Sequence, residues 1–236
     1  MRAVILAGGL GTRRKPYTTS LPKPLMPING EMPILEVILR QLKKEGFTHI
    51  TIAVGHLSEI IRAFFGDGSR WGIKLDYSLE DRPLSTIGPL TLVEDLPEHF
   101  LVMNGDILSD IGYRVLMDSH KKSGADVTVA VAKRNVKIDF GVLDYRDNTI
   151  VGFREKPRYD FDVSMGVYVI SRHVISSLQR AVPYGFDNLM LDGIARGLKM
   201  KVYPHGGYWL DIGRPDDFDR ANDEFGAMRE RLIGEG

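Results

Sequence analysis

Glycines and cations gather directly after the first apolar run of the chain, residues 3–7. The glycines are Gly8, Gly9 and Gly11, and the cations are Arg13 and Lys23. Glycine lets backbone N–H groups approach a polyphosphate closely, and fixed positive charge holds it there. These residue types predict a site for the phosphates of a nucleotide. The alternative is a Gly- and Pro-rich surface loop whose basic residues are only solvated.

Two familiar phosphate-binding loops do not fit this stretch. The dinucleotide fingerprint G-x-G-x-x-G, started at Gly9, needs a third glycine where the chain has Arg14. The nucleotide loop G-x-x-x-x-G-K-[ST] is absent from the sequence. Both would also begin a helix at once, whereas five prolines keep residues 16–33 irregular.

Lys23 stands between two prolines, Pro22 and Pro24. A proline restricts the residue before it to an extended backbone, so the lysine ammonium is aimed rather than left free to wander. A long irregular connection inside a compact domain usually carries function. We expect the loop at the carboxyl end of a first parallel strand, where open α/β sheets bind their ligands.

Two acids follow apolar runs that look like buried strands. Residues 100–103 lead into Asn104-Gly105-Asp106, and residues 208–210 lead into Asp211. Mg²⁺ that binds phosphate substrates is held by one or two carboxylates, with water and substrate oxygens as the other ligands. The two acids could therefore be its carboxylate ligands. Taken singly, Asn104-Gly105 also fits a hairpin turn, and Asp211 also fits a helix cap.

The stretch GGLGTRRKPYTTSLPKPL resembles the signature of the sugar nucleotidyltransferases, written G-G-x-G-T-R-L-x-P-x-T-x-x-x-P-K-P-L. Arg14 replaces the leucine of that pattern. NGD at 104–106 and W-L-D-I-G at 209–213 resemble the metal segments of the family. The resemblance implies Mg²⁺ on Asp106 and Asp211, with Arg13, Lys23 and Asp106 as the catalytic residues.

The resemblance also implies which residues contact each substrate. Phe140-Gly141-Val142 is similar to the sugar-side segment Y-G-V, and Glu155-Lys156-Pro157 to E-K-P, whose glutamate meets sugar hydroxyls and whose lysine meets the sugar phosphate. The implied sugar-phosphate residues are Gly141, Glu155, Lys156 and Ser164. The implied nucleotide residues are Leu6, Ala7, Gly8, Gly9, Gly11, Thr12, Arg13, Lys23, Thr86, Gly88, Asn104 and Gly105.

Three departures from the family pattern lie in these segments. Ser85 and Ile87 replace glycine and alanine in the base-side segment P-L-G-T-A-G-A-L, and Ser164 stands where many members have asparagine. The last change removes an amide that could have reached a sugar hydroxyl.

Composition is that of an ordinary globular chain. Of 236 residues, 43% are hydrophobic and 26% charged, and 31 basic residues balance 31 acidic ones, so no overall field favours nucleic acid or a lipid surface. Without cysteine there is no disulfide framework or thiolate chemistry. The first apolar run is too short for a membrane span, and we expect a cytoplasmic protein. Residues 1–236 are expected to form one domain without an appended β-helix domain, because hexapeptide repeats are absent.

Alternating strand and helix patterns predict an α/β fold with a doubly wound, mostly parallel, Rossmann-like sheet. Helices are expected at 33–46, 57–65, 113–122 and 214–232, and strands at 3–7, 50–54, 73–77, 100–103, 127–132 and 167–170. Residues 141–145 and 149–153 flank an Asp-Asn turn and predict a hairpin. Small antiparallel additions are therefore expected in the second half.

The resemblance implies transfer of a nucleotidyl group from an NTP to a sugar 1-phosphate, with in-line attack and release of pyrophosphate. Guanine with a mannose or heptose 1-phosphate is favoured, and a uridylyl- or thymidylyltransferase is the alternative. A non-catalytic regulatory paralogue that binds nucleotide sugars is an alternative of another class, and a GT-A glycosyltransferase is a third. A homo-oligomer stays open.

Overall fold

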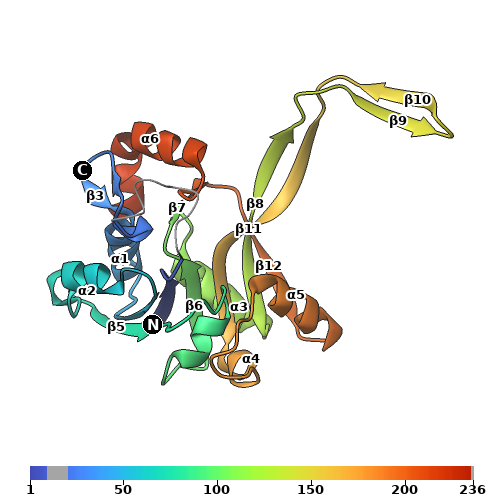
Figure 1. Ribbon diagram of the computed structural model, residues 1–236. Helices are drawn as coiled ribbons and strands as arrows, with labels where there is room; N and C mark the ends of the chain where they lie inside the picture. The colour runs from blue at the N-terminus through green and yellow to red at the C-terminus, as the bar shows by residue number, and fades with distance from the viewer. Residues whose placement is uncertain (10–20, 235–236) are drawn as a thin grey trace.

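The computed structural model describes residues 1–9 and 21–234 and is built on a central sheet (Figure 1). Its strands are β1 (Arg2–Leu6), β4 (His49–Val54), β5 (Lys74–Leu79), β6 (His99–Asn104), β8 (Val127–Lys137), β11 (Arg158–Ser171) and β12 (Met200–His205). Their order is β12-β8-β11-β6-β1-β4-β5. β11 runs antiparallel to both neighbours, while the other pairs in this sheet are parallel. The mostly parallel sheet is confirmed.

The two faces of the sheet are covered by different helices. Ala3 and Ile5 of β1 belong to a core with residues of α1 (Ile34–Lys44), α2 (Ser58–Phe65), α3 (Tyr113–Ser123) and α6 (Pro215–Ile233). Val4 belongs to a second core with residues of the 3₁₀ helix η5 (Gly88–Leu92), α4 (Arg172–Ser176) and α5 (Phe186–Ala195). Successive side chains of a strand point to opposite faces, so this split confirms the doubly wound arrangement.

The apolar spacing and the end residues that predicted the helices are found in the structure. In α1 the residues Ile34, Ile38 and Leu42 are fully buried along one face, and the helix begins directly after Pro33. α2 ends at Phe65 and is capped by Gly66, whose φ of 54° suits a residue without a Cβ. Short elements gave no periodic signal. These are η3 (Lys23–Leu25), η4 (Ser69–Trp71), β2 (Pro27–Ile28), β3 (Met32–Pro33), β7 (Ile107–Ser109) and β13 (Trp209–Asp211).

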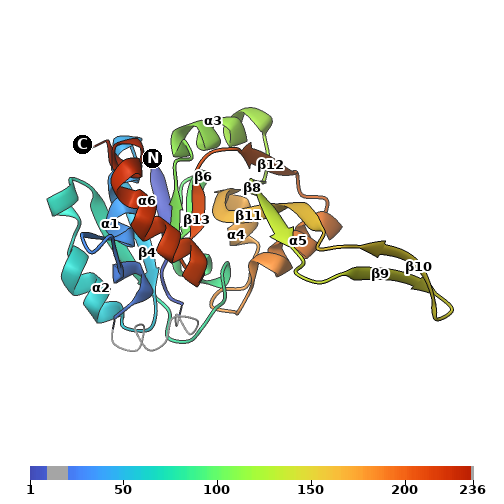
Figure 2. The same ribbon diagram turned by 90° about the horizontal axis from the view of Figure 1, so that it is seen from above.

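A long two-stranded arm projects from the body of the molecule. The arm comprises residues 132–163: the outer parts of β8 and β11, and the hairpin of β9 (Val142–Arg146) and β10 (Thr149–Arg154). In both views the hairpin lies clear of the helices and the central sheet (Figures 1 and 2). The predicted turn residues Asp147 and Asn148 have φ of 47° and 61°, as a two-residue hairpin turn requires.

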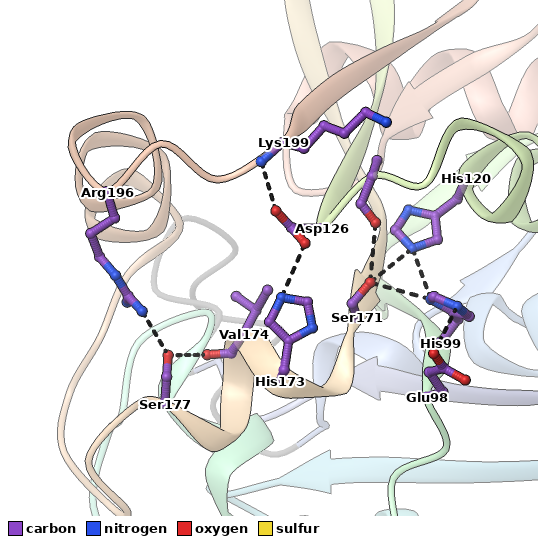
Figure 3. Close-up of polar contacts among 11 residues, drawn as sticks. Glu98, His99, His120, Asp126, Ser171, His173, Val174, Ser177, Arg196 and Lys199 are labelled. Atoms are coloured by element: carbon purple, nitrogen blue, oxygen red, sulfur yellow. Dashed lines mark hydrogen bonds and ion pairs between the residues drawn. The ribbon is translucent and has the colours of Figure 1, made fainter.

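A buried histidine lies at the amino ends of the parallel strands, opposite the edge where ligands are expected (Figure 3). Nε2 of His120 is 3.2 Å from Nδ1 of His99 and 3.3 Å from Oγ of Ser171, and its Nδ1 is 2.8 Å from Oγ1 of Thr128. Burial lowers the pKa of His120 to about 4, and the neighbouring His99 lowers it as well. The cluster is a satisfied polar network in the core.

Within residues 1–9 and 21–234, no helix is both long enough and apolar enough to cross a membrane.

Candidate active site

The carboxyl ends of β1, β4 and β5 bring Gly8, Gly55 and Glu80 together. A Cβ on Gly55 would lie 3.1 Å from the carbonyl oxygen of Gly8, and a Cβ on Gly8 would collide with Oε1 of Glu80. The other carboxylate oxygen, Oε2, accepts the N–H of Leu84 at 3.0 Å. Burial raises the pKa of Glu80, and the hydrogen bond from Leu84 opposes that rise. The carboxylate of Glu80 therefore lies directly beside Gly8, and a side chain at Gly8 would displace it.

Lys23 is the first residue of the 3₁₀ helix η3, so the prediction of an extended backbone at Lys23 is wrong. The N–H of Leu25 donates to Pro22 at 2.8 Å, and this turn outweighs the preference that Pro24 imposes on the residue before it. Pro22 has an extended backbone, with φ −58° and ψ 137°, and Pro24 and Leu25 are buried. The ammonium group of Lys23 forms an ion pair with Asp106, and the two side chains are only 15% and 21% exposed. The lysine is therefore aimed into the site rather than at bulk water.

Asp211 reaches the same place from a different part of the chain. β13 pairs with β7, so that Asp211 lies opposite Ile107, which directly follows Asp106. A Cβ on Gly213 would lie 2.5 Å from Nζ of Lys23, 2.8 Å from Oδ1 of Asp211 and 3.4 Å from Oδ2 of Asp106. Three charged groups that are far apart in sequence thus surround one glycine.

The structure contains neither of the alternative roles, the helix cap at Asp211 or the hairpin turn at Asn104-Gly105. Oδ1 of Asp211 accepts the N–H of Gly213 at 2.8 Å, and the N-cap of α6 is Arg214, without a capping side-chain hydrogen bond. Asp106 lies between β6, which ends at Asn104, and β7. These two strands belong to different sheets, so the residues between them do not form a hairpin turn.

The donor set suits a hard divalent cation. Asp106 and Asp211 offer carboxylate oxygens, and Mg²⁺ prefers oxygen ligands from one or two carboxylates completed by water and substrate phosphate. In the described part of the chain no group of three or more His, Cys, Asp or Glu could hold a metal ion. The carboxylates of Asp106 and Asp211 are the side chains of this centre that could contribute oxygen ligands to such an ion.

Other residues predicted to bind the substrates lie near this centre, at the ends of β1 and β6 and within β11. The N–H of Gly105 donates to Leu6 at 2.9 Å, and the N–H of Ala7 donates to Ala53 at 2.8 Å. A Cβ on Gly166 would lie 2.7 Å from Nδ2 of Asn104. Oγ of Ser164 accepts the N–H of Gly166 at 3.3 Å, which places Ser164 on the Asn104 side of the centre.

The predicted base-side segment is fixed by a loop from the second half of the chain. The N–H groups of Ile87 and Gly88 both donate to the carbonyl oxygen of Tyr184 at 2.9 Å. A Cβ on Gly88 would lie 2.7 Å from the carbonyl oxygen of Val182. Thr86 is partly exposed beside this anchored segment.

Not every predicted residue comes to the centre. Gly141, Glu155 and Lys156 lie on the arm, next to the β9–β10 hairpin, which Figure 1 shows well away from β7. The side chains of Glu155 and Lys156 are 60% and 56% exposed. Gly9 is exposed. Gly11, Thr12 and Arg13 lie outside the described residues.

Two residues of the site carry no sequence signal of their own. Glu80 acquires its place only through the sheet order, which sets β5 close to the Gly8 loop. Asp217 lies in the first turn of α6, and its Oδ2 accepts the N–H of Asp211 at 3.2 Å. Arg134 in turn donates to both oxygens of Asp217, at 2.9 and 3.2 Å. Asp217 therefore positions Asp211.

Comparison with known proteins decides the family. A family model described as nucleotidyl transferase matches residues 2–227. The chain belongs to the nucleotidyl transferase family. The resemblance to sugar nucleotidyltransferases is confirmed.

Curated relatives of this nucleotidyl transferase are named guanylyltransferases. It is 34% identical over 230 residues to a probable mannose-1-phosphate guanylyltransferase 1 of Oryza sativa subsp. japonica, covering 92% of this chain and 63% of that one. It is 30% identical to a D-glycero-alpha-D-manno-heptose 1-phosphate guanylyltransferase of Aneurinibacillus thermoaerophilus, covering 95% and 98%. The chain thus spans less than two thirds of the mannose-type relative and nearly all of the heptose-type relative.

Solved structures share the fold. A putative glucose-1-phosphate thymidylyltransferase from Bacillus anthracis, in complex with a sucrose, matches with a TM-score of 0.74 at 25% identity, covering 94% of each chain. HddC from Yersinia pseudotuberculosis, complexed with GMP-PN, matches with a TM-score of 0.73 at 24% identity, covering 95% of this chain and 99% of that one. The second likeness speaks for the fold alone.

Proposed function

We propose that this nucleotidyl transferase joins the nucleotidyl group of an NTP, by preference GTP, to a mannose- or heptose-type sugar 1-phosphate. A phosphate oxygen of the sugar 1-phosphate attacks the α-phosphorus in line, the bond from that phosphorus to the bridging oxygen breaks, and pyrophosphate leaves. The products are an NDP-sugar and pyrophosphate. The observation that carries the proposal is the convergence of Lys23, Asp106 and Asp211 around Gly213.

The main obstacle to this reaction is repulsion between two phosphate substrates. Two unit charges 4 Å apart repel by about 4 kcal/mol at an effective dielectric near 20, and several such pairs must meet. Lys23 offers a preorganised ammonium group with three N–H donors, of which the Asp106 pair uses one. We infer that the others bind phosphate oxygens, and the resemblance assigns the guanidinium of Arg13 to the same role.

Asp106 and Asp211 would hold the Mg²⁺ ion, which when bound supplies positive charge that polarises phosphoryl oxygens. The chain supplies the rigid support for this pair. Asp211 is fixed by its hydrogen bond to Asp217, and Asp217 by the two hydrogen bonds from Arg134. Preorganised charge needs no rearrangement at the moment of reaction.

Glu80 supports guanine as the base. An ionised carboxylate only accepts hydrogen bonds, and guanine presents N1–H and N2–H donors side by side. Uracil and thymine present a single N–H between two carbonyl oxygens, which a carboxylate repels. Glu80 lies between the Gly8 loop and the anchored segment that contains Thr86 and Gly88, and only one of its oxygens accepts the N–H of Leu84.

A pyrophosphate-release assay tests the whole proposal. Four NTPs are each combined with mannose, heptose, glucose and N-acetylglucosamine 1-phosphates in the presence of Mg²⁺. The proposal expects GTP with a mannose- or heptose-type acceptor to give the highest kcat/KM. A preference for UTP or dTTP would replace guanine, and binding without pyrophosphate release from any pair would identify a regulatory paralogue.

The Glu80→Gln variant sharpens the base assignment. Glutamine keeps an oxygen for the Leu84 N–H but loses the charge, so kcat/KM for GTP should fall ~10- to 100-fold, as expected for a charge-assisted hydrogen bond. Asp118→Asn, an exposed acid of α3, is the matched control. Equal losses with all four NTPs would remove Glu80 from base recognition.

A further inference from the structure

The strand pair formed by β7 and β13 carries both carboxylates of the centre at one end. Its ladder consists of three residue pairs, Asp211↔Ile107, Leu210↔Leu108 and Trp209↔Ser109. Just beyond the first pair, the N–H of Ile212 donates to the carbonyl oxygen of Asp106 at 2.9 Å. The two strands form a small sheet of their own, apart from the central sheet. Such a pair is only marginally stable by itself, so its neighbours must hold it in place.

Asp110 lies at the opposite end of this strand pair, directly after β7. Its N–H donates to the carbonyl oxygen of Tyr208 at 3.1 Å, and its Oδ1 accepts the N–H of Tyr208 at 2.7 Å. A single residue thus binds both main-chain groups of the residue that leads into β13. The pairing of the two strands is therefore continued by the side chain of Asp110.

The carboxylate of Asp110 is buried and joins two other elements to this end. Its side chain is 5% exposed. Nε2 of His205, the last residue of β12, lies 2.9 Å from Oδ1 of Asp110 and 3.4 Å from the carbonyl oxygen of Tyr208. Both neighbours are acceptors, so Nε2 carries a proton and donates it. Oδ2 of Asp110 forms an ion pair with Arg231, in the last turn of α6.

The surroundings of Asp110 are closely packed. A Cβ on Gly207 would collide with Oδ1 of Asp110 and lie 2.7 Å from Cε1 of His205, so any side chain there would displace one of these groups. Nε2 of Gln41, a residue of α1 that is 4% exposed, donates to the carbonyl oxygen of Ser109 at 2.7 Å. β12, α1 and α6 thus all contact this end of the strand pair. It is therefore the anchored end.

β13 needs support at both ends because a strand held at one point can still pivot about it. Asp217 holds the N–H of Asp211 at one end, and Asp110 holds Tyr208 at the other. Between them, the indole N–H of Trp209 donates to the carbonyl oxygen of Met165 at 3.1 Å. That contact acts through a side chain with rotatable bonds and fixes the backbone less directly.

We propose that Asp110 is a positioning residue that sets Asp211 opposite Asp106 through β7 and β13. Asp110 fixes Tyr208, and the ladder carries that position over about 10 Å to Asp211. Only carboxylates held at the right separation can share one cation. That the shared ligand is a divalent cation bound with a nucleotide rests on the proposed function, whereas the positioning of Asp211 does not.

Manganese binding tests the effect on the cation site without turnover. The protein is titrated with Mn²⁺ in the absence of substrates, and the EPR signal of the free ion is followed. Groups that hold a metal-binding carboxylate in place strongly affect metal affinity, so Asp110→Ala should raise the Kd for Mn²⁺ ~10-fold or more. Asp110→Asn keeps an oxygen for the Tyr208 N–H but loses the charge beside Arg231, and its Kd should lie between the two.

Asp126→Ala is the matched control for the loss of a hydrogen-bonded carboxylate (Figure 3). Asp126 also accepts a backbone N–H, that of Lys199 at 2.7 Å, and also lies beside a histidine, with Oδ1 3.0 Å from Nε2 of His173. It directly precedes β8, at the amino ends of the parallel strands. The Kd for Mn²⁺ should be unchanged in this variant. An equal rise in both alanine variants would overturn the proposal.

Amide hydrogen exchange tests the positioning without reference to any ligand. The N–H of Ile212 reports on the end of the strand pair that is remote from Asp110. Asp110→Ala should speed its exchange at least ~10-fold, while the buried amides of β1 exchange as in the wild type. If Asp110 served only local stability, exchange would rise at Tyr208 and stay unchanged at Ile212, and the proposal would be overturned.

The Mg²⁺ dependence of pyrophosphate release separates this proposal from the proposed function. In Asp110→Ala the Mg²⁺ concentration for half-maximal rate should rise ~10-fold, while kcat at saturating Mg²⁺ stays within about threefold. An unchanged Mg²⁺ dependence in an active variant would overturn the proposal. A wild-type chain that neither releases pyrophosphate nor binds Mn²⁺ would instead refute the proposed function. The exchange of Ile212 alone would then decide whether Asp110 positions Asp211.

Discussion

The body and the arm of this molecule use β-strands in opposite ways. In β1, Ala3, Val4 and Ile5 are fully buried because neighbouring strands and helices cover the strand on every side. In β9 and β10 no residue is buried. β8 and β11 belong to both regions and change from buried to exposed where they leave the central sheet.

This difference separates two tasks. The body holds Lys23, Asp106 and Asp211 around Gly213, and the side chains of Lys23 and Asp106 are only 15% and 21% exposed there. No residue of β9 or β10 is buried, so the side chains of the arm have no core to hold them. We therefore expect body substitutions to change chemistry or stability, and arm substitutions to change substrate affinity.

The largest effect is expected in the body, at Asp106. Asp106→Asn preserves the size of the side chain but removes the charge that pairs with Lys23 and would bind Mg²⁺. The value of kcat should therefore fall ~10³-fold or more, while the melting temperature changes little. Steady-state pyrophosphate release and thermal unfolding measure the two. A near-normal rate would remove Asp106 from the catalytic centre.

The same substitution at two phenylalanines compares the regions directly. Phe100 of β6 is fully buried, so Phe100→Ala should cost ~3–5 kcal/mol of unfolding free energy. Phe153→Ala on the arm should cost less than ~0.5 kcal/mol, because its side chain is already 60% exposed. Urea unfolding at concentrations where the chain is monomeric measures both, and equal costs would mean that the arm packs on its own body.

Burial in the body also predicts a pH dependence. His120 has a folded pKa of about 4 against 6.5 when exposed, so between these values the unfolded state binds more protons. Stability should fall as the pH drops from 6.5 to 4, by up to ~3 kcal/mol, and this contribution stays constant above 6.5. The free energy of unfolding, measured across this window, gives the slope.

The variant His120→Gln should flatten that slope, whatever it does to stability at pH 7. His56→Gln, at an exposed histidine, is the matched control and should leave the slope as it is. An unchanged slope in His120→Gln would show that other groups cause the acid sensitivity.

The smallest of these effects is expected on the arm. Lys156→Ala removes one ammonium group from the sugar-phosphate side, so the KM for the sugar 1-phosphate should rise ~10-fold with kcat and the KM for GTP nearly unchanged. Lys201→Ala, at an exposed lysine of β12, is the control. A change confined to the KM for GTP would contradict the placement of Lys156.

Sequence reasoning predicted what periodicity and motifs can encode. The apolar spacing of Ile34, Ile38 and Leu42 predicted α1, and the Asp147-Asn148 turn predicted the hairpin. It could not predict β7, because a strand of three residues has no measurable period. Glu80 was missed because its role depends on which strands are neighbours. The projection of the arm was missed because alternation says which residues share a face, not what covers it.

The measurement that tests the central claim most directly is the position of a metal ion in a crystal grown with Mn²⁺ and a non-hydrolysable GTP analogue. Anomalous scattering locates the ion without reference to any assumed role. The account predicts a manganese peak bound by both Asp106 and Asp211 and in contact with the nucleotide phosphates near Lys23. A nucleotide bound elsewhere, or an ion that neither aspartate contacts, would contradict it.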